Sequence, residues 1–327
     1  MNVQAKSARL ERGEDAITLV QGRWNGYSPT EFVTPEWVIS AWQHLPELGE
    51  PIVAAVEDES GWCALALTAT SAAQGDGFTL AGAPLGDEHD VVASGAADAD
   101  RLVPYLVDAL ERLAERGHMI DLGALAAAGP LTRELADRPD SWALDREPAP
   151  VIYTDAARVN VTGHRRRLRQ LSRRGETIFI TVDGGRLTSD EVSGFVSRRL
   201  ASWSRRERIG DLPRVERLAS FPAFLGSAAG GLAGRDRARL LAVEVDGHRI
   251  AESLHIGPSR DPLMYMINYD PDFAQLSPGR VLLEHTLLQL GAETSRLRTG
   301  RGDEAYKIAA GARLDYVVNG RSTLGGR

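Results

Sequence analysis

The pattern of apolar and polar positions predicts an α/β chain in which one order of elements occurs twice. In the first half, Thr34-Pro-Glu-Trp37 predicts a helix start, with threonine as N-cap and proline at the first helical position. The runs 51–57 and 62–70 predict two strands of a hairpin. Residues 101–116 carry leucines at helical spacing, and 119–125 predict a further strand.

The second half shows the same order. Thr188-Ser-Asp-Glu191 fits a capping box in front of an apolar stripe, which predicts a helix. The runs 238–245 and 249–256 flank an Asp-Gly turn and predict a hairpin, and 263–269 predict another strand. Ser277-Pro-Gly-Arg280 then opens a leucine-rich helix. We therefore expect a mixed, largely antiparallel sheet flanked by helices in each half.

The length of 327 residues favours two domains. The prolines of Pro148-Ala-Pro150, with a short strand after them, mark the end of the first unit. We predict an α/β (α+β) fold with domains 1–155 and 156–327.

Composition indicates a soluble protein. Apolar residues make up 43% and charged residues 25% of the chain, without an apolar run long enough to cross a bilayer. The polar N-terminus does not resemble a secretory signal, and the single cysteine, Cys63, lies in an apolar run. We expect a cytoplasmic protein without membrane partner, and the scattered histidines predict no metal site.

Charge divides the chain more sharply than its net value of −7 indicates. Residues 1–150 contain 10 basic and 25 acidic side chains, whereas residues 151–327 contain 28 and 20. An anionic substrate or cofactor is therefore expected to dock on the C-terminal half.

The predicted helix start at Ser277 carries the first chemical argument. Unpaired N–H groups and the helix dipole make such a start suitable for a phosphate. Gly279 lets a ligand approach the backbone, and Arg280 adds a charged donor. Because no Gly-x-Gly-x-x-Gly or Walker-type loop occurs, dinucleotide and nucleoside triphosphate chemistry lack support.

A second cluster lies in Gly302-Asp-Glu-Ala-Tyr-Lys307. The chain has only two lysines, Lys6 and Lys307, so position 307 indicates a need for an ammonium group; the alternative is chance retention on a helix surface. If a helix begins at Gly302, Asp303 and Lys307 stand at i and i+4 on one face. This pair either takes part in chemistry together with Tyr306 or forms a structural ion pair.

These stretches resemble a known family. Tyr269-Asp-Pro-Asp272, Ser277-Pro-Gly279 and the 302–307 segment, in this order, resemble the C-terminal signature of tandem GNAT acyltransferases of the cellulose-biosynthesis-associated type. The arginine-rich segment 165–174 resembles the basic opening helix of that family, and Phe32-Val-Thr-Pro-Glu-Trp37 its N-terminal entry. The sequence departs from the pattern at Ala305, where proline is common, and at 308–310, where an aromatic residue is frequent.

The resemblance implies two GNAT-like domains and direct transfer of an acyl group from acyl-CoA, in the first place acetyl-CoA, to an amine. It implies that Ser277, Gly279 and Arg280 hold the pyrophosphate of the donor. By the same resemblance Tyr306 is the acid for the leaving thiolate; the alternative is that it is simply a core residue. The N-terminal domain lacks both motifs and is not expected to bind the donor. The acceptor is a small molecule or sugar amine whose identity stays open, as does the oligomeric state.

Such a reaction needs a base for the attacking ammonium. Glu252 and His255 are candidates on the predicted strand 249–256, where alternation puts them on opposite faces. Burial on an apolar face would raise the pKa of Glu252 and suit a base. The alternative is a buried glutamate paired with an arginine.

Two other functions stay open. Fem-type transferases, which have a related tandem architecture, take aminoacyl groups from tRNA, and a basic helix is what a nucleic acid requires. The arginine segment is short and has no interleaved aromatic residue, so acyl-CoA is favoured over tRNA. The third reading is a non-catalytic accessory protein of a biosynthetic pathway that keeps the fold without the chemistry.

Overall fold

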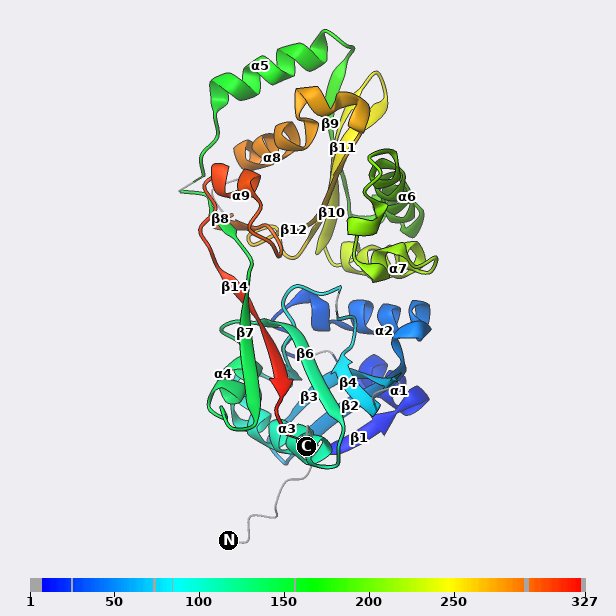
Figure 1. Cartoon of the computed structure of the whole chain (residues 1–327), viewed down its shortest axis with the longest axis vertical. Helices are drawn as coiled ribbons and strands as arrows, with labels where there is room; N and C mark the ends of the chain where they lie inside the picture. The colour runs from blue at the N-terminus through cyan, green and yellow to red at the C-terminus, as the bar shows by residue number, and fades with distance from the viewer. Residues whose placement is uncertain are drawn as a thin grey trace. The chain divides into compact units, whose positions relative to one another are not determined.

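A computed structural model describes residues 8–24, 26–72, 75–83, 85–155, 157–290 and 294–324. The chain divides into two compact units (Figure 1). The first unit comprises Met1–Glu147 and Tyr316–Arg327, and the second unit comprises Pro148–Asp315. The expected class, an α/β chain with two sheets, is confirmed. The sequence expectation had placed residues 316–327 in the second domain, whereas the last strand pairs with the first unit.

The strands of the first unit are β1 (Arg9–Arg12), β2 (Glu50–Glu57), β3 (Trp62–Ala72), β4 (Gly75–Leu80), β5 (Val92–Ala93), β6 (Met119–Ala126), β7 (Trp142–Pro148) and β14 (Tyr316–Ser322). Its helices are α1 (Gly13–Arg23), α2 (Pro35–His44), α3 (Ala96–Glu115) and α4 (Pro130–Ala136), with 3-10 turns η1 (Glu31–Val33) and η2 (Pro46–Leu48). In this unit, α2, β2, β3 and β6 begin at or next to the predicted positions, α3 begins five residues before the predicted 101, and the other elements were not predicted.

The first sheet has the strand order β1-β2-β3-β4-β6-β14-β7, with β5 beside β3. The expected hairpin is β2 and β3, which pair antiparallel with Glu57 opposite Trp62. β4 and β6 run parallel, because α3 crosses over between them. β14 lies between β6 and β7 and pairs antiparallel with β6, with Val317 opposite Ala126.

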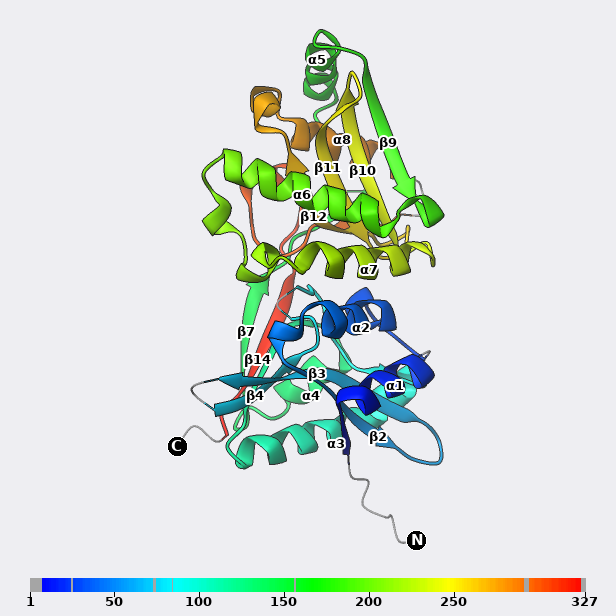
Figure 2. The ribbon, with the colours of Figure 1, turned by 90° about the vertical axis from the view of Figure 1, so that its right-hand side faces the viewer.

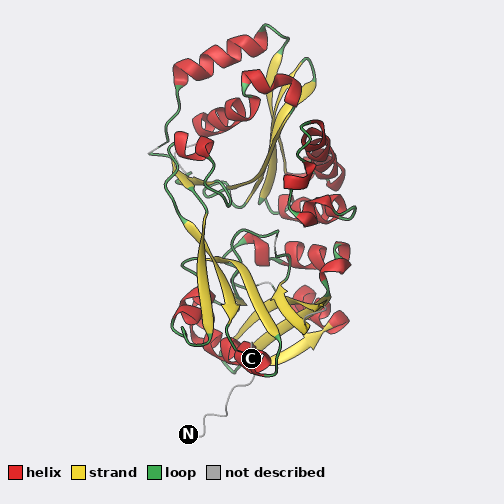
Figure 3. Cartoon of the chain, in the orientation of Figure 1, coloured by secondary structure: helices red, strands yellow, loops and turns green. Residues whose placement is uncertain are grey.

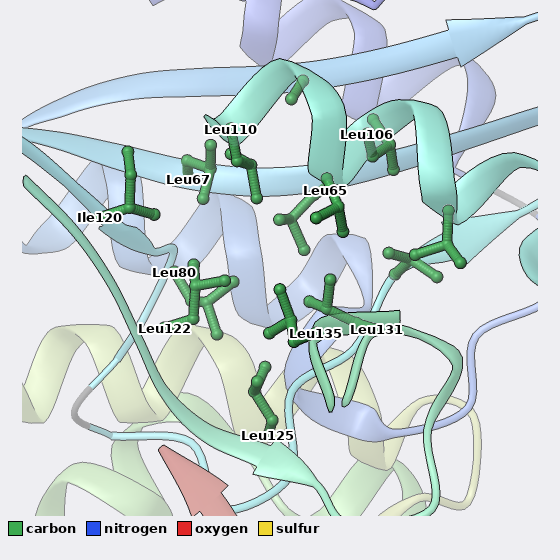
Figure 4. Packing of buried hydrophobic residues seen from close by; sticks show 14 of the residues in the cluster. Leu65, Leu67, Leu80, Leu106, Leu110, Ile120, Leu122, Leu125, Leu131 and Leu135 are labelled. Atoms are coloured by element: carbon green, nitrogen blue, oxygen red, sulfur yellow. The ribbon is translucent and has the colours of Figure 1, made fainter. Parts of the chain in front are cut away.

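Helices cover both faces of this sheet. α3 and α4 bury leucines against one face of β3 and β6, where Leu65, Leu106, Leu110 and Leu122 meet (Figure 4). α1 and α2 pack on the other face, through a second cluster that contains Val20, Val38, Trp42, Val53 and Ala64. Most of these side chains are fully buried, so this unit has its own hydrophobic core.

The second unit has a smaller sheet. Its strands are β8 (Val151–Tyr153), β9 (Thr177–Asp183), β10 (Ala238–Val245), β11 (His248–Ile256), β12 (Leu263–Tyr269) and β13 (Arg296–Arg298). Its helices are α5 (Val161–Ser172), α6 (Ser189–Arg205), α7 (Phe221–Ala233), α8 (Pro278–Gln289) and α9 (Ala305–Ala309), with 3-10 turns η3 (Gly184–Arg186), η4 (Ile209–Asp211), η5 (Arg214–Arg217) and η6 (Pro271–Leu276).

Local sequence explains how these elements begin. The Thr188 side chain accepts a hydrogen bond from the Glu191 N–H group and caps α6, as the capping box predicted. Asp246 and Gly247 both have positive φ angles of 50° and 76°, which allows the tight turn between β10 and β11. α6 and α7 cover one face of the sheet, and α8 covers the other together with α5 (Figures 2 and 3).

Two neighbouring strands of this sheet pair over a single residue only. The strand order is β8-β13-β12-β11-β10-β9; the other neighbouring strands run antiparallel, whereas β12 and β13 run parallel. Their register joins Leu263 to Arg298, the last residue of β13. The later part of β12, which contains Ile267 and Tyr269, therefore extends beyond its neighbour, toward the start of α8.

Candidate functional site

A pocket of about 330 Å³ lies at the start of α8. The end of β12, the η6 turn, the first turn of α8 and helix α9 surround it. Its lining residues are Ile267, Tyr269, Ala274, Ser277, Pro278, Gly279, Arg280 and Tyr306. The lining is largely apolar, with polar groups at a helix start, which is typical of a small-molecule site.

The backbone conformation of Ser277 forms the start of this helix. Ser277 has φ 51° and ψ 54°, in the left-handed region, and Pro278 occupies the first helical position. The Ser277 side chain does not cap the helix, so it does not occupy the N–H groups of the first turn. Those groups and the helix dipole are available to an anion, and its binding there stays a prediction.

Gly279 leaves space in the pocket. A β-carbon at this position would lie 3.6 Å from Ile267 Cδ1 and 3.9 Å from Tyr269 Cδ1, which are ordinary contacts. The fold therefore does not require glycine here for steric reasons. A larger side chain would instead occupy part of the pocket.

Arg280 is held by its own helix. Its Nε donates to Glu284 Oε1 at 2.9 Å, and its side chain is 47% exposed. Glu284 is buried and also contacts Arg167 and, at 3.2 Å, His164 Nδ1 of α5. Among the described residues, no protein group accepts a hydrogen bond from the Nη groups of Arg280, which can turn toward an anion at the helix start.

Tyr306 faces the same pocket from α9. Burial raises the pKa of its hydroxyl above the ordinary value, and the Glu304 carboxylate adds to the shift. An ordinary phenol is already protonated at neutral pH, so Tyr306 carries a proton that it can donate, and the raised pKa makes it a weaker acid than a free phenol.

Glu252 lies elsewhere, on the α6 side of β11. It is 2% exposed, and Arg198 donates to both of its oxygens at 2.8 Å. Arg249 Nη1 donates a further hydrogen bond at 3.0 Å. This geometry is that of the paired glutamate, the alternative that the sequence left open.

His255 is buried and contacts Ser253, two residues away on the same strand, through Nε2 at 2.9 Å. Its other ring nitrogen, Nδ1, has no hydrogen-bond partner among the described residues. Burial, with the charge of Arg239, lowers the pKa of His255 to about 3, so the ring is neutral at physiological pH. It does not line the pocket at Ser277.

Lys307 is buried and closes the loop in front of α9. Its Nζ donates to the carbonyl groups of Gly300, Arg301 and Gly302 at 3.2, 2.8 and 3.0 Å. It also forms an ion pair with Glu304 at 2.7 Å. A compact ammonium group with three donors suits this arrangement, which explains the choice of lysine in an arginine-rich chain.

The expected i, i+4 pair of Asp303 and Lys307 does not form. α9 begins at Ala305, so Asp303 precedes the helix and is exposed. The ion pair goes to Glu304 instead, because this residue stands three positions before Lys307 at the N-cap. Of the sequence-based candidates, Ser277, Gly279, Arg280 and Tyr306 therefore meet in one pocket, while Glu252, His255, Asp303 and Lys307 do not line it.

Sequence reasoning gave no role to Tyr269 and Ile267, which also line the pocket. Tyr269 was part of the family-like motif, and this was the signal that could have identified it. Within the described ranges, no cluster of histidine, cysteine and carboxylate side chains could hold a metal ion. None of the helices in those ranges combines the length and apolar character needed to cross a bilayer.

Comparisons with known proteins identify the type of domain and the fold. Residues 160–308 match the family model described as an acetyltransferase (GNAT) domain. This match covers α5 to α9 and the whole pocket, so the second unit carries a GNAT-type acyltransferase domain, and the resemblance seen in the sequence is confirmed at this level. No curated protein matches the chain.

Solved structures resemble the whole chain. A protein of unknown function from Bacteroides thetaiotaomicron is 8% identical, with a TM-score of 0.60 over 96% of this chain and 99% of that one. FemX is 10% identical, with a TM-score of 0.57 over 97% of each chain. L-PGS from Bacillus licheniformis is 10% identical, with a TM-score of 0.53 over 93% of this chain and 94% of that one. At these identities the likeness concerns the fold.

Proposed function

We propose that the chain is a cytoplasmic N-acyltransferase that moves an acyl group, in the first place acetyl, from acyl-CoA to the amine of a small-molecule or sugar acceptor. The observation that carries the proposal is the pocket at the start of α8, which combines an anion-binding helix start with Tyr306. The GNAT family match covers the same residues. The acceptor is not specified by these features.

Each part of the pocket has a place in this reaction. Ser277, Gly279 and Arg280 receive the pyrophosphate of the donor through first-turn N–H groups and a guanidinium group. The apolar wall of Ile267 and Tyr269 suits the pantetheine arm, and the open edge beside β12 admits it. The amine attacks the thioester carbonyl carbon, the carbon–sulfur bond breaks, and Tyr306 gives its proton to the leaving thiolate.

The attacking nitrogen must also lose a proton. No carboxylate or histidine is among the described residues that line the pocket, so the proton passes to water or to a group outside it. Glu252 and His255 are kept as candidates for this base. Glu252 would first have to exchange its hydrogen bonds with Arg198 and Arg249.

Calorimetric titration of the full chain with acetyl-CoA and longer acyl-CoAs tests the proposal. Arg280→Ala is expected to weaken binding about tenfold or more, because a charged hydrogen bond to phosphate is lost. Gly279→Leu should abolish binding while the fold persists, because the pocket is filled. Arg186→Ala is the matched control. This arginine is 70% exposed and distant in sequence from Ser277, so the variant should bind acyl-CoA as the wild type does. Absence of acyl-CoA binding by the wild type would rule out this donor.

Aminoacyl-tRNA is the second candidate donor, and one surface favours it. α5 and the turn after it expose Arg165, Arg166, Arg169, Arg173 and Arg174, and none of them forms an ion pair with another described residue. Arg167 of the same helix instead faces Glu284. A row of free guanidinium groups is suited to a phosphate backbone.

The salt dependence of tRNA binding tests this second donor. If tRNA is the donor, the affinity falls steeply with salt, and replacing Arg165, Arg166 and Arg169 together by glutamine reduces that slope by about 2 to 3. If wild type and the triple variant bind tRNA equally weakly, the arginines serve solubility and the acyl-CoA proposal stands alone.

A further inference from the structure

Arg206 lies over two aromatic rings beside the pocket. Its guanidinium carbon is 4.6 Å from the ring centre of Trp203 and 4.7 Å from that of Tyr269. Its Nε donates to the Ser202 carbonyl group at 3.2 Å, and Nη1 donates to the Tyr269 hydroxyl oxygen at 3.2 Å. Stacking and two hydrogen bonds therefore fix the position of this charged group.

Arg206 differs from the arginines around it in its lack of a carboxylate partner. Arg199 pairs with Glu216, Arg205 with Asp270 and Arg208 with Asp211, at 2.9, 2.9 and 2.7 Å. Among the described residues no carboxylate lies within ion-pair distance of Arg206. Its remaining N–H groups are available to an anion from outside the chain.

Tyr269 connects this guanidinium to the pocket. Its ring lines the pocket at Gly279, and its hydroxyl contacts Arg206. Because Arg206 donates to the phenol oxygen, the phenol hydrogen must point to another acceptor. The Tyr269 O–H group and the remaining N–H groups of Arg206 are thus neighbouring donors next to a ring that lines the pocket.

We propose that Arg206 and Tyr269 bind an oxyanion, phosphate or carboxylate, that belongs to a substrate of this pocket and is distinct from the anion at Ser277. The inference rests on the proposed function in that it takes the pocket as the substrate site. A guanidinium that is fixed in place binds such a group with two parallel hydrogen bonds and loses little side-chain entropy. The oxyanion comes either from the donor, as a phosphate outside its pyrophosphate, or from an acidic acceptor.

Calorimetry with coenzyme A, 3′-dephospho-coenzyme A and inorganic pyrophosphate tests the donor as source. Arg206→Gln is expected to weaken coenzyme A binding about tenfold. It should leave binding of the dephospho compound unchanged if the 3′-phosphate is the group bound. Arg208→Gln is the matched control, because Arg208 lies over the same Trp203 ring but is paired with Asp211, and it should bind all three as wild type does. Arg206→Lys keeps the charge and reports whether the planar fork is needed.

Steady-state kinetics with paired acceptors tests the second source. Glucosamine 6-phosphate is compared with glucosamine, and glycine with glycinamide. If the acceptor supplies the oxyanion, Arg206→Gln raises KM for the acidic member of a pair about tenfold, leaves kcat nearly unchanged and does not affect the neutral member.

The outcomes separate this inference from the proposed function. Equal responses of wild type and Arg206→Gln to every probe, including no response at all, overturn the inference. If wild type binds coenzyme A and Arg206→Gln changes nothing, the proposed donor stands and the oxyanion site falls. If the wild type does not bind coenzyme A but binds pyrophosphate, and Arg206→Gln weakens that binding, coenzyme A is excluded as the donor and the oxyanion site is supported.

Discussion

Arg198 of α6 donates a hydrogen bond to each carboxylate oxygen of Glu252 in β11, both at 2.8 Å. The glutamate is almost fully buried, whereas the arginine side chain is 41% exposed. This contact joins the helix to the sheet on the side away from α8. It accounts for a charged residue in an otherwise apolar strand, because a buried carboxylate must be paired.

Removing this carboxylate should destabilise the second unit. We predict that Glu252→Gln lowers the free energy of unfolding by about 2 to 3 kcal/mol, since it removes the negative charge that Arg198 pairs with at both oxygens and leaves a single amide oxygen as acceptor. Urea unfolding measures this, and a double-mutant cycle with Arg198→Ala should give a coupling of about 1 to 2 kcal/mol. A variant with unchanged stability but greatly reduced kcat would instead make Glu252 the general base.

We predict that replacing Lys307, even by arginine, lowers the stability of the second unit. Lys307→Arg is expected to cost about 1 to 3 kcal/mol and Lys307→Met about 2 to 4 kcal/mol, because three buried carbonyl groups lose a compact donor. Thermal unfolding checks both values. Asp303→Asn is the control, with a change below about 0.5 kcal/mol since this side chain is exposed. Full stability of Lys307→Arg would contradict the loop-closing role.

Tyr306→Phe tests the proposed acid. We expect kcat for acyl transfer to fall about 100-fold while the affinity for acyl-CoA and the melting temperature stay near wild type, because only a hydroxyl group is removed from a half-exposed ring. Rapid kinetics with acetyl-CoA and a thiol reagent provides the measurement. An unchanged kcat would mean that water protonates the thiolate.

We expect the buried carboxyl group of Asp90 to make the stability of the first unit depend on pH. This side chain is 1% exposed, and its Oδ1 accepts hydrogen bonds from the N–H groups of Val91 and Leu131 at 2.8 and 3.1 Å. Burial raises the pKa of Asp90 to about 6 despite these bonds. Because the folded state holds the proton more tightly than the unfolded state, stability falls as pH rises from about 4 to about 6, and the loss is complete above that.

The loss amounts to about 3 kcal/mol for a shift of about two pKa units. Asp90→Asn keeps an acceptor for both N–H groups and should remove most of this slope, so that it is more stable than wild type at about pH 7 but not at about pH 4. Urea unfolding followed by tryptophan fluorescence at both pH values measures the difference. Parallel pH profiles for variant and wild type would show that Asp90 does not titrate in this range.

Local rules predicted those parts of the fold that depend on neighbours in sequence. The cap at Thr188, the turn at Asp246 and the helix start at Ser277 each follow from a few adjacent residues. The opposite faces of Glu252 and His255 follow from strand alternation. The predicted end of α3 and the predicted start of α8 were close, whereas α3 begins at Ala96, five residues before the predicted start; Gly291, expected to end α8, lies outside the described residues.

What the sequence could not predict depends on contacts between distant segments. The stack of Arg206 on Tyr269 joins residues of different elements, and no local pattern marks one arginine among its neighbours as unpaired. The pairing of Val317 with Ala126 is equally remote along the chain. The charge division survives the new boundaries, with 12 basic and 25 acidic residues in the first unit and 26 and 20 in the second.

The place of β14 has a consequence for how the protein is made. This strand lies between β6 and β7, yet it is translated after the entire second unit. During translation, the edges of β6 and β7 that pair with β14 therefore remain without hydrogen-bond partners from β14 while about 170 further residues are synthesised. The second unit can fold first, and nascent chains that stop before Tyr316 expose these edges to chaperones and to aggregation.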